Sequence, residues 1–226
     1  MSIQTKIIVP IRPSSLALAK RQIRAILKTY DLVEVWLDRL PKLAEAQIRA
    51  LEKIAPGRLI FNLKGKAEQG DFRGSPLERV RLLAAVQASF VDLPLDFPFL
   101  RQFRSLTQAR LILSWHDFKA MPSLSVWRKK VQQAEKKPAA IIKLVGSARR
   151  LADNLIVLRL AAELEKKGRS FIVLAMGESG LVSRVVAPFF GAFGMFAPLR
   201  KANQTAPGQL TAAELRKWWG VFFARE

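Results

Sequence analysis

One lysine lies in an apolar segment where its side chain could act as a reactive amine. Residues 139–145 read Ala-Ala-Ile-Ile-Lys-Leu-Val, with the length and branched residues of a buried strand. Lys143 has aliphatic neighbours on both sides, and burying an ammonium without a partner is costly. Its side chain therefore either extends to solvent at the strand end or stays buried as an amine of lowered pKa.

The single histidine of the chain, His116, is the second candidate for chemistry. It follows an apolar segment, residues 109–115, in the run Ser-Trp-His-Asp-Phe. An unperturbed imidazole titrates near pH 6.5, as general acid-base catalysis requires. A single imidazole and the absence of cysteine argue against a metal site here. A buried lysine beside an imidazole instead indicates imine chemistry, because desolvation favours the neutral, nucleophilic amine.

The elements that must position these two residues alternate regularly along the chain. Apolar runs predict strands at Lys6–Ile11, Leu32–Leu37, Arg58–Lys64, Ser89–Leu93, Ala109–Trp115, Ala139–Val145, Ser170–Met176 and Ala192–Ala197. Apolar residues at helical spacing predict helices at Ser14–Thr29, Lys42–Ile54, Ser75–Gln87, Phe97–Leu106, Ser123–Glu135, Ala148–Lys167, Leu181–Phe190 and Thr211–Phe223. Ser14 or Ser15 can cap the first helix, and Gly168 ends the sixth.

This order of strand and helix predicts a parallel sheet covered by helices. Eight such units within 226 residues favour a single-domain (β/α)8 TIM barrel over residues 1–226. An open doubly wound sheet is the alternative, but it needs a glycine-rich turn after the first strand, and residues 11–15 (Ile-Arg-Pro-Ser-Ser) have none. In a barrel, Lys143 and His116 lie on neighbouring units, and catalysis occurs at the carboxyl ends of the strands.

Composition limits the other classes of function. The net charge of +20 and the sequence pI near 11.1 suggest nucleic-acid binding, but the basic residues are spread over the expected helix faces. The same charge suits an acidic small-molecule substrate. No window is apolar for the roughly 18 residues that a membrane helix needs, and the N-terminal residues have no signal-peptide pattern. We expect a soluble cytoplasmic protein without membrane or nucleic-acid partners.

Several segments together resemble the type I 3-dehydroquinate dehydratase family, from the first strand to the last helix. The resemblance rests on Ser114–Phe118 (SWHDF), Ile142-Lys143, Met176–Arg184 (MGESGLVSR), Thr205–Gln209 (TAPGQ) and Phe61–Gly70 (FNLKGKAEQG). The histidine, Ser-Arg and Ala-Pro-Gly-Gln elements are specific as a set and weak singly. The resemblance implies dehydration of 3-dehydroquinate to 3-dehydroshikimate in the shikimate pathway of aromatic amino-acid biosynthesis, with no cofactor and no metal.

The same resemblance assigns roles to eight residues. Lys143 would form a Schiff base with the C3 ketone, His116 would act as general acid and base, and Glu68 would orient the histidine. Arg184 matches the guanidinium that binds the substrate carboxylate. Thr205 and Gln209 match a loop that closes over the substrate, and Glu34 and Lys64 match residues that contact its ring hydroxyls. Family members are commonly homodimers, so a homodimer is expected.

The chain also departs from the family pattern. The family has Glu-x-Arg-x-Asp at the end of the second strand, where this chain has Trp36 in place of the arginine between Glu34 and Asp38. Lys64 replaces a second arginine and loses its bidentate geometry. Gln69 replaces a glycine. The groups for chemistry are present, and substrate binding is the part that these changes affect.

Two other functions remain open on the sequence. A class I aldolase-like barrel would use the same lysine on another keto compound, although Ser183-Arg184 and the Thr205–Gln209 loop favour a carboxylate substrate. A degenerate barrel that binds nucleic acid or an acidic partner through its positive charge would need no intact site.

Overall fold

The fold consists of eight parallel strands that alternate with eight helices, a (β/α)8 barrel. The computed structural model describes residues 5–223, so residues 1–4, on which the expectation of no leader partly rests, lie outside the described part. The strands, in their order across the sheet, are β7 (Phe171–Met176), β6 (Ile141–Ser147), β5 (Arg110–His116), β4 (Phe90–Pro94), β3 (Leu59–Asn62), β2 (Leu32–Trp36), β1 (Lys6–Ile11) and β8 (Gly194–Phe196). The amide of Phe193 donates to the carbonyl of Phe171 at 2.8 Å, so β8 also lies beside β7. The predicted fold class is confirmed.

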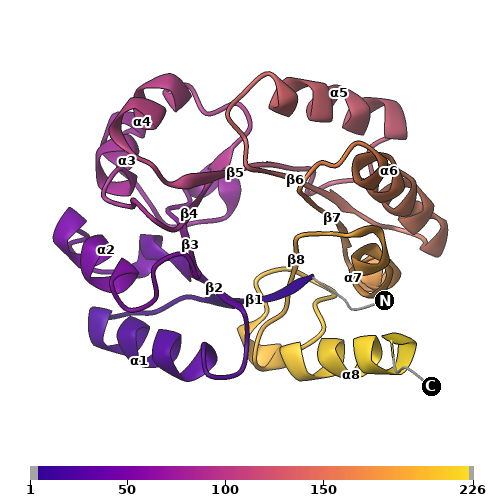
Figure 1. The fold of residues 1–226 in the computed structure, drawn as a ribbon, viewed down its shortest axis with the longest axis horizontal. Coiled ribbons are helices and arrows are strands. Elements are labelled where there is room, and N and C mark those ends of the chain that lie inside the picture. Colours follow the sequence, from indigo (N-terminus) through magenta and orange to yellow (C-terminus); the bar gives the residue numbers. More distant parts are fainter. Residues whose placement is uncertain (1–4, 224–226) are drawn as a thin grey trace. The chain divides into compact units, whose positions relative to one another are not determined.

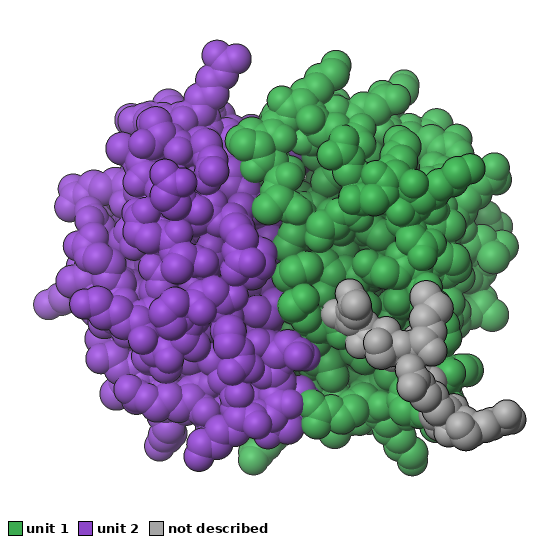
Figure 2. Space-filling view, viewed as in Figure 1, with its two compact units in different colours: residues 1–9, 113–226 green, residues 10–112 purple. Residues whose placement is uncertain are grey.

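The chain folds as two compact units, residues 1–9 with 113–226 and residues 10–112 (Figure 2). In the second unit, β2 (Leu32–Trp36), β3 (Leu59–Asn62) and β4 (Phe90–Pro94) are neighbours, and Trp36 pairs with Asn62 in register. They are accompanied by α1 (Leu16–Ile26), α2 (Glu45–Glu52), α3 (Pro76–Leu83) and α4 (Leu100–Leu106). Consecutive apolar residues of these strands are buried, as Leu59, Ile60 and Phe61 are in β3, which is expected for a parallel sheet covered on both faces by helices.

The first unit holds most of β1 (Lys6–Ile11) and of β5 (Arg110–His116), together with β6 (Ile141–Ser147), β7 (Phe171–Met176) and β8 (Gly194–Phe196). Lys143 pairs in register with Ile172 of β7. The helices α5 (Leu124–Glu135), α6 (Asn154–Lys166), α7 (Leu181–Val186) and α8 (Ala212–Phe223) follow these strands in turn, and α6 and α7 lie against β7 (Figure 1). Among residues 5–223, no helix combines the length and apolar character that crossing a membrane requires.

Serine side chains cap two helix starts, one of them at Ser15 as predicted. The hydroxyl of Ser15 accepts from the amide of Leu18 at 3.2 Å, and that of Ser75 accepts from the amide of Glu78 at 3.1 Å. Each bond satisfies one of the free amides of a first helical turn. Gly168 ends α6 with φ +63°, a left-handed conformation that glycine adopts without strain.

Several predicted boundaries are wrong for identifiable local reasons. The helix predicted from Lys42 begins at Glu45, because Lys42 has φ +49° and cannot continue a right-handed helix. The helix predicted from Ala148 begins at Asn154. Asp153 accepts from the amides of Arg149 and Arg150 at 2.8 and 3.2 Å, which holds that segment in a turn.

Other helices and strands are shorter than predicted. The α-helix predicted for Leu181–Phe190 ends at Val186 and continues as a 3-10 turn, because Pro188 lacks an amide donor. The helix predicted to reach Gln87 ends at Leu83, and the carboxylate of Glu52 instead accepts from the amides of residues 87–89. The second strand ends at Trp36, and the third at Asn62 rather than Lys64.

Candidate active site

Lys143 is buried in the middle of the sheet and does not extend to solvent. It is the third residue of β6, and 4 % of it is exposed. Its Nζ lies 4.1 Å from the centre of the Phe196 ring at the end of β8. The aromatic face partly replaces the water that an ammonium loses on burial. The structure therefore excludes the interpretation in which this lysine reaches the surface.

His116 is the last residue of β5 and is half-buried. Its ring stacks on Phe118 with 5.5 Å between centroids and 7° between planes. The turn that follows is held by Asp117, whose Oδ1 accepts from the amides of Lys119 and Ala120 at 2.9 Å each. Asp117 thus caps this turn. A fixed turn and a stacked ring limit the orientations open to the imidazole.

Arg184 is a buried cation on α7 with unused hydrogen-bonding capacity. One per cent of the residue is exposed, and its Nε and Nη2 have no hydrogen-bond partner among residues 5–223. Burial lowers its pKa to about 10, so the guanidinium is still charged at neutral pH. A buried cation with free donors is suited to binding an anion such as a carboxylate.

The helix that carries Arg184 is fastened to the end of β7 by its neighbour. Ser183 Oγ accepts from the amide of Ala175 at 2.9 Å and donates to the carbonyl of Gly180 at 2.7 Å. The amide of Ser183 donates to Asn154 Oδ1 at 2.9 Å. Ser183 therefore anchors the helix that carries Arg184.

Thr205 and Gln209 are brought together in one loop. Gln209 Oε1 accepts from the amide of Thr205 at 2.8 Å, and its Nε2 lies 3.1 Å from Thr205 Oγ1. Gly208 has φ +74°, and a Cβ there would lie 2.1 Å from the carbonyl oxygen of Gly177. The amide of Gly177 in turn donates to the carbonyl of Pro207 at 3.1 Å. The loop is therefore docked on the carboxyl end of β7, and only glycine fits at the contact.

In residues 10–112, Glu34 and Lys64 share a common neighbour, Trp36. The indole Nε1 donates to Glu34 Oε2 at 2.6 Å, and Asn62 Nδ2 donates to Glu34 Oε1 at 3.3 Å. Lys64 Nζ lies 4.2 Å from the centre of the indole. All four side chains are buried, with 8 % or less of each residue exposed. The residue that replaces the family arginine thus organises both predicted hydroxyl-binding groups.

Glu68 is held by an arginine that the sequence does not single out. Arg79 of α3 binds its carboxylate through two nitrogens, at 2.5 and 3.2 Å. Arg79 is 6 % exposed, and its guanidinium also lies 5.4 Å from the Phe97 ring. The two-pronged contact fixes the plane of the Glu68 carboxylate. The predicted pairing of Glu68 with His116 stays a prediction.

Sequence reasoning also missed Phe196, the aromatic neighbour of Lys143, and Asn62, the amide neighbour of Glu34. Each lies within two residues of the end of a predicted strand, so a list of strand-end residues that included aromatic and amide side chains would have found them. Their contacts depend on side-chain direction, which residue spacing does not give.

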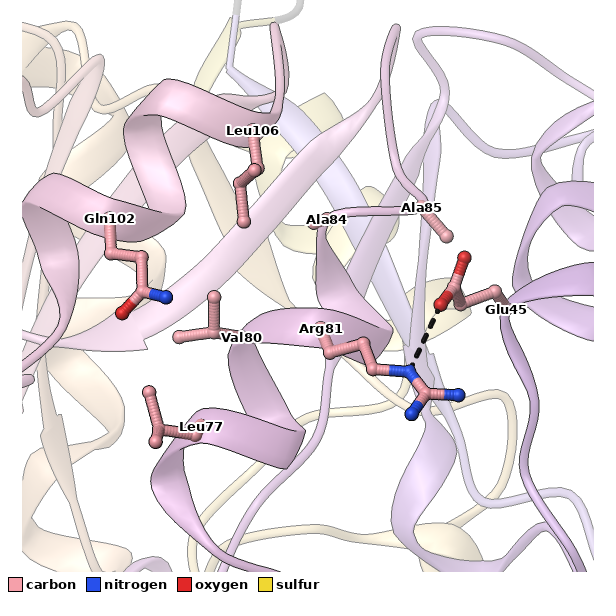
Figure 3. Close-up of a pocket in the computed structure, with 8 residues that line it drawn as sticks. All are labelled: Glu45, Leu77, Val80, Arg81, Ala84, Ala85, Gln102 and Leu106. Carbon is pink, nitrogen blue, oxygen red and sulfur yellow. Dashed lines mark hydrogen bonds and ion pairs between the residues drawn. The ribbon is translucent and has the colours of Figure 1, made fainter.

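A groove of about 460 Å³ on residues 10–112 is a separate feature (Figure 3). It lies along α2, α3 and α4, and its lining includes Leu77, Val80 and Leu106. Its charged groups, Glu45 and Arg81, pair with each other at 3.3 Å. None of the predicted site residues lines it, so we do not assign the chemistry to this groove.

Known proteins match this chain over nearly its whole length. The model of the family described as type I 3-dehydroquinase matches residues 7–225. A 3-dehydroquinate dehydratase from Methanothermobacter thermautotrophicus is 34% identical over 220 residues, which cover 96% of each chain. The crystal structure of 3-dehydroquinate dehydratase from Geobacillus kaustophilus superposes with a TM-score of 0.84 at 22% identity, covering 98% of this chain and 93% of that one.

A second solved structure carries a covalently modified ligand. It is a type I 3-dehydroquinate dehydratase from Clostridium difficile with covalent modified comenic acid, and it superposes with a TM-score of 0.80 at 20% identity. The match covers 96% of this chain and 92% of that one.

Proposed function

Because the chain belongs to the type I 3-dehydroquinase family, we propose that it is a hydro-lyase that converts 3-dehydroquinate to 3-dehydroshikimate and water. The observation that carries this proposal is the burial of two cations of different kinds in residues 113–226. Lys143 offers a primary amine on β6, and Arg184 offers a guanidinium with free donors on α7. A substrate with both a ketone and a carboxylate matches this pair.

Lys143 is the proposed nucleophile. Its neutral amine attacks the C3 ketone, and loss of one water gives a protonated imine, the Schiff base. The positive nitrogen withdraws electrons and acidifies the protons on C2. Burial beside Phe196 keeps bulk water away from the imine until the product has formed.

His116 is the proposed general base and acid. It removes a proton from C2, which leaves an enamine, and the enamine electrons then expel the C1 hydroxyl. The protonated imidazole gives its proton to that hydroxyl, which leaves as water. A second water hydrolyses the imine, releases 3-dehydroshikimate and restores the Lys143 amine. Glu68 is the proposed orienting carboxylate, held in its own plane by Arg79.

Five residues are proposed to hold the substrate. Arg184 binds the carboxylate, since it is charged, buried and rich in free donors. The loop with Thr205 and Gln209 covers the substrate from its docked position on Gly177. Glu34 and Lys64 contact the ring hydroxyls, one as an acceptor and the other as a donor.

The proposal extends to the setting of the reaction. We propose a cytoplasmic homodimer that works in the shikimate pathway without metal or cofactor. Imine formation supplies the electron sink that a metal or cofactor would otherwise provide, so a chelator is expected to leave the rate unchanged.

Trapping of the imine tests the function directly. The protein is treated with 3-dehydroquinate and sodium borohydride, digested and examined by peptide mass spectrometry. We expect a substrate-derived mass on the peptide that contains Lys143, and the absorbance of the conjugated enone product without borohydride. Lys143→Met is expected to lose the adduct and to lower kcat by more than about 10⁴-fold, because the covalent route is removed.

A matched control is Lys129→Met, which changes an exposed lysine of α5. It is expected to keep both the adduct and the rate. If wild-type protein forms neither adduct nor enone, the proposed function is wrong. An adduct with other keto acids but not with 3-dehydroquinate would instead favour the aldolase-like alternative.

A further inference from the structure

Arg12 lies against the residue that replaces the family arginine. It directly follows β1, and its guanidinium carbon is 3.8 Å from the centre of the Trp36 indole. Lys64 Nζ is 4.2 Å from the centre of the same side chain. One buried aromatic residue therefore contacts two cations, which come from the segments after β1 and β3.

This indole also holds the neighbouring acceptor. Trp36 Nε1 donates to Glu34 at 2.6 Å, so the ring cannot rotate without breaking that bond. Asn62 pairs with Trp36 in register and donates to the same Glu34 carboxylate, which further fixes the orientation of the indole. The cluster thus presents one carboxylate and two cations on a rigid platform. Arg12, Trp36, Asn62 and Lys64 all lie at or just beyond the carboxyl ends of parallel strands, where barrels bind their substrates.

Arg12 itself is only partly satisfied. Its Nε is buried and has no hydrogen-bond partner among residues 5–223. Burial, and then the nearby Arg39, lower the pKa of Arg12 below the ordinary arginine value, while Asp38 and Glu34 oppose this shift. A guanidinium with a donor that has no partner in the described part of the chain, held 3.8 Å from the centre of an aromatic ring, is preorganised to donate to a ligand oxygen.

We propose that Arg12 is a substrate-binding residue that donates to a ring-hydroxyl oxygen of the substrate and so replaces the arginine that Trp36 displaces. Trp36 acts as the stacking platform that holds the guanidinium in place. This inference rests on the proposed function, since it names a further contact to the same substrate. It also assigns a role to Trp36, because the replacement of the family arginine by this tryptophan would otherwise only remove a positive charge from the site.

A purely structural stack exists elsewhere in the same unit and provides a matched control. Arg110 also lies 3.8 Å from the centre of an aromatic ring, that of Phe90. However, Arg110 begins β5, so it lies at the opposite end of the strand from the carboxyl end, where catalysis is expected. It also donates to the carbonyl of Gly57 at 3.0 Å. Its loss is expected to affect stability and not substrate binding.

Steady-state kinetics with 3-dehydroquinate tests the inference on the full-length protein. Arg12→Met is expected to raise KM about tenfold or more, the effect of losing one charged hydrogen bond, with kcat within about twofold of wild type. Arg12→Lys keeps the charge but loses the planar fork, so its KM should be intermediate. The double variant Arg12→Met with Trp36→Arg is expected to recover most of the lost affinity. Arg110→Met should have the KM of wild type.

The outcomes separate this inference from the function on which it rests. An active wild-type protein and an unchanged KM in folded Arg12→Met would overturn the role of Arg12 and leave the dehydratase proposal intact. An equal rise of KM in Arg110→Met would also overturn it, because the effect would then not be local to the site. A wild-type protein without turnover would overturn both proposals.

Discussion

The proposed site residues fall into two sets, the first half in residues 113–226 and the second half in residues 10–112, and the two differ in how closely they follow the family pattern that the sequence resembles. The first half has the lysine, the histidine, the Ser-Arg pair and the closing loop of that pattern. The second half has Glu34 and Glu68 but replaces two arginines, with Trp36 and Lys64. Lys143 and His116, the groups proposed for bond breaking, thus belong to the half that follows the pattern, and the substitutions fall among the groups proposed to hold hydroxyls.

The cations of the two halves also have different surroundings. Arg184 is buried with two nitrogens that have no hydrogen-bond partner among residues 5–223, which leaves donors for the proposed carboxylate contact. Arg12 and Lys64 instead both lie against the ring of one indole, and the acceptor beside them is bonded to the same indole. Chemistry at a fixed amine tolerates little substitution, whereas binding of a hydroxyl can be moved from one cation to another if a rigid support is present.

The strongest test of this contrast removes a group of the first half that is proposed to act in proton transfer alone. His116→Ala is expected to lower kcat by about 10²–10⁴-fold, because general acid-base catalysis typically supplies that factor. Borohydride trapping should still label Lys143, since the lysine can form an imine slowly without the imidazole. The measurements are kcat at neutral pH and the adduct mass after prolonged incubation.

A variant of the stacking partner provides the control. Phe118→Leu leaves the imidazole in place and removes only the ring that stacks on it at 5.5 Å. We expect a far smaller loss of kcat. If Phe118→Leu is as slow as His116→Ala, the stacked turn rather than the imidazole carries the effect.

The pH dependence of KM tests the free guanidinium of the first half. Arg184 has a pKa of about 10, so it is charged below that pH and neutral above it. Binding of a carboxylate therefore requires the low-pH form and is lost as pH rises. We expect KM to be flat up to about pH 9 and to rise about tenfold per pH unit above 10.

Arg184→Gln separates this titration from other high-pH effects. The variant is expected to have KM raised about 100-fold at neutral pH, from the loss of a two-pronged charged contact. It should also lack the break near pH 10. A break at the same pH in Arg184→Gln would assign the titration to another group, and circular dichroism at each pH would verify that the protein is folded.

Much of the fold follows from the sequence because the strands are apolar and the breaks between elements are explicit. β1 has the predicted bounds, and β5, β6 and β7 differ from prediction by one or two residues at an end. The helix ends are less well predicted, because they depend on single side chains far away in sequence. Glu52, which binds the amides that follow α3, comes more than thirty residues before them.

The residues of the candidate site also differ in whether the sequence alone could identify them. Lys143 could be selected because a charged residue in a buried strand is conspicuous, and Arg184 because its Ser-Arg motif resembles that of the family. Arg12 and Arg79 could not be selected, because arginines are common in a chain of net charge +20. Phe196 could be listed as a residue near a strand end, but an aromatic residue in an apolar strand is ordinary and does not indicate a role. Their importance comes from what they contact: an indole, a carboxylate and an ammonium.

The smallest effect is expected from a substitution that keeps the platform of the second half and removes one hydrogen bond. Trp36→Phe retains an aromatic face for Arg12 and Lys64 but deletes the donor to Glu34. Loss of one hydrogen bond of about 0.7–1.4 kcal/mol predicts a rise of KM of about three- to tenfold, with kcat unchanged. Trp219→Phe is the matched control, because the indole nitrogen of Trp219 is buried without a hydrogen-bond partner in the described part of the chain. It removes the same atoms from the interior, so it should lower Tm and leave KM unchanged. A Trp36→Phe enzyme with wild-type KM would mean that the indole acts through its ring alone and that Glu34 is positioned by its other contacts.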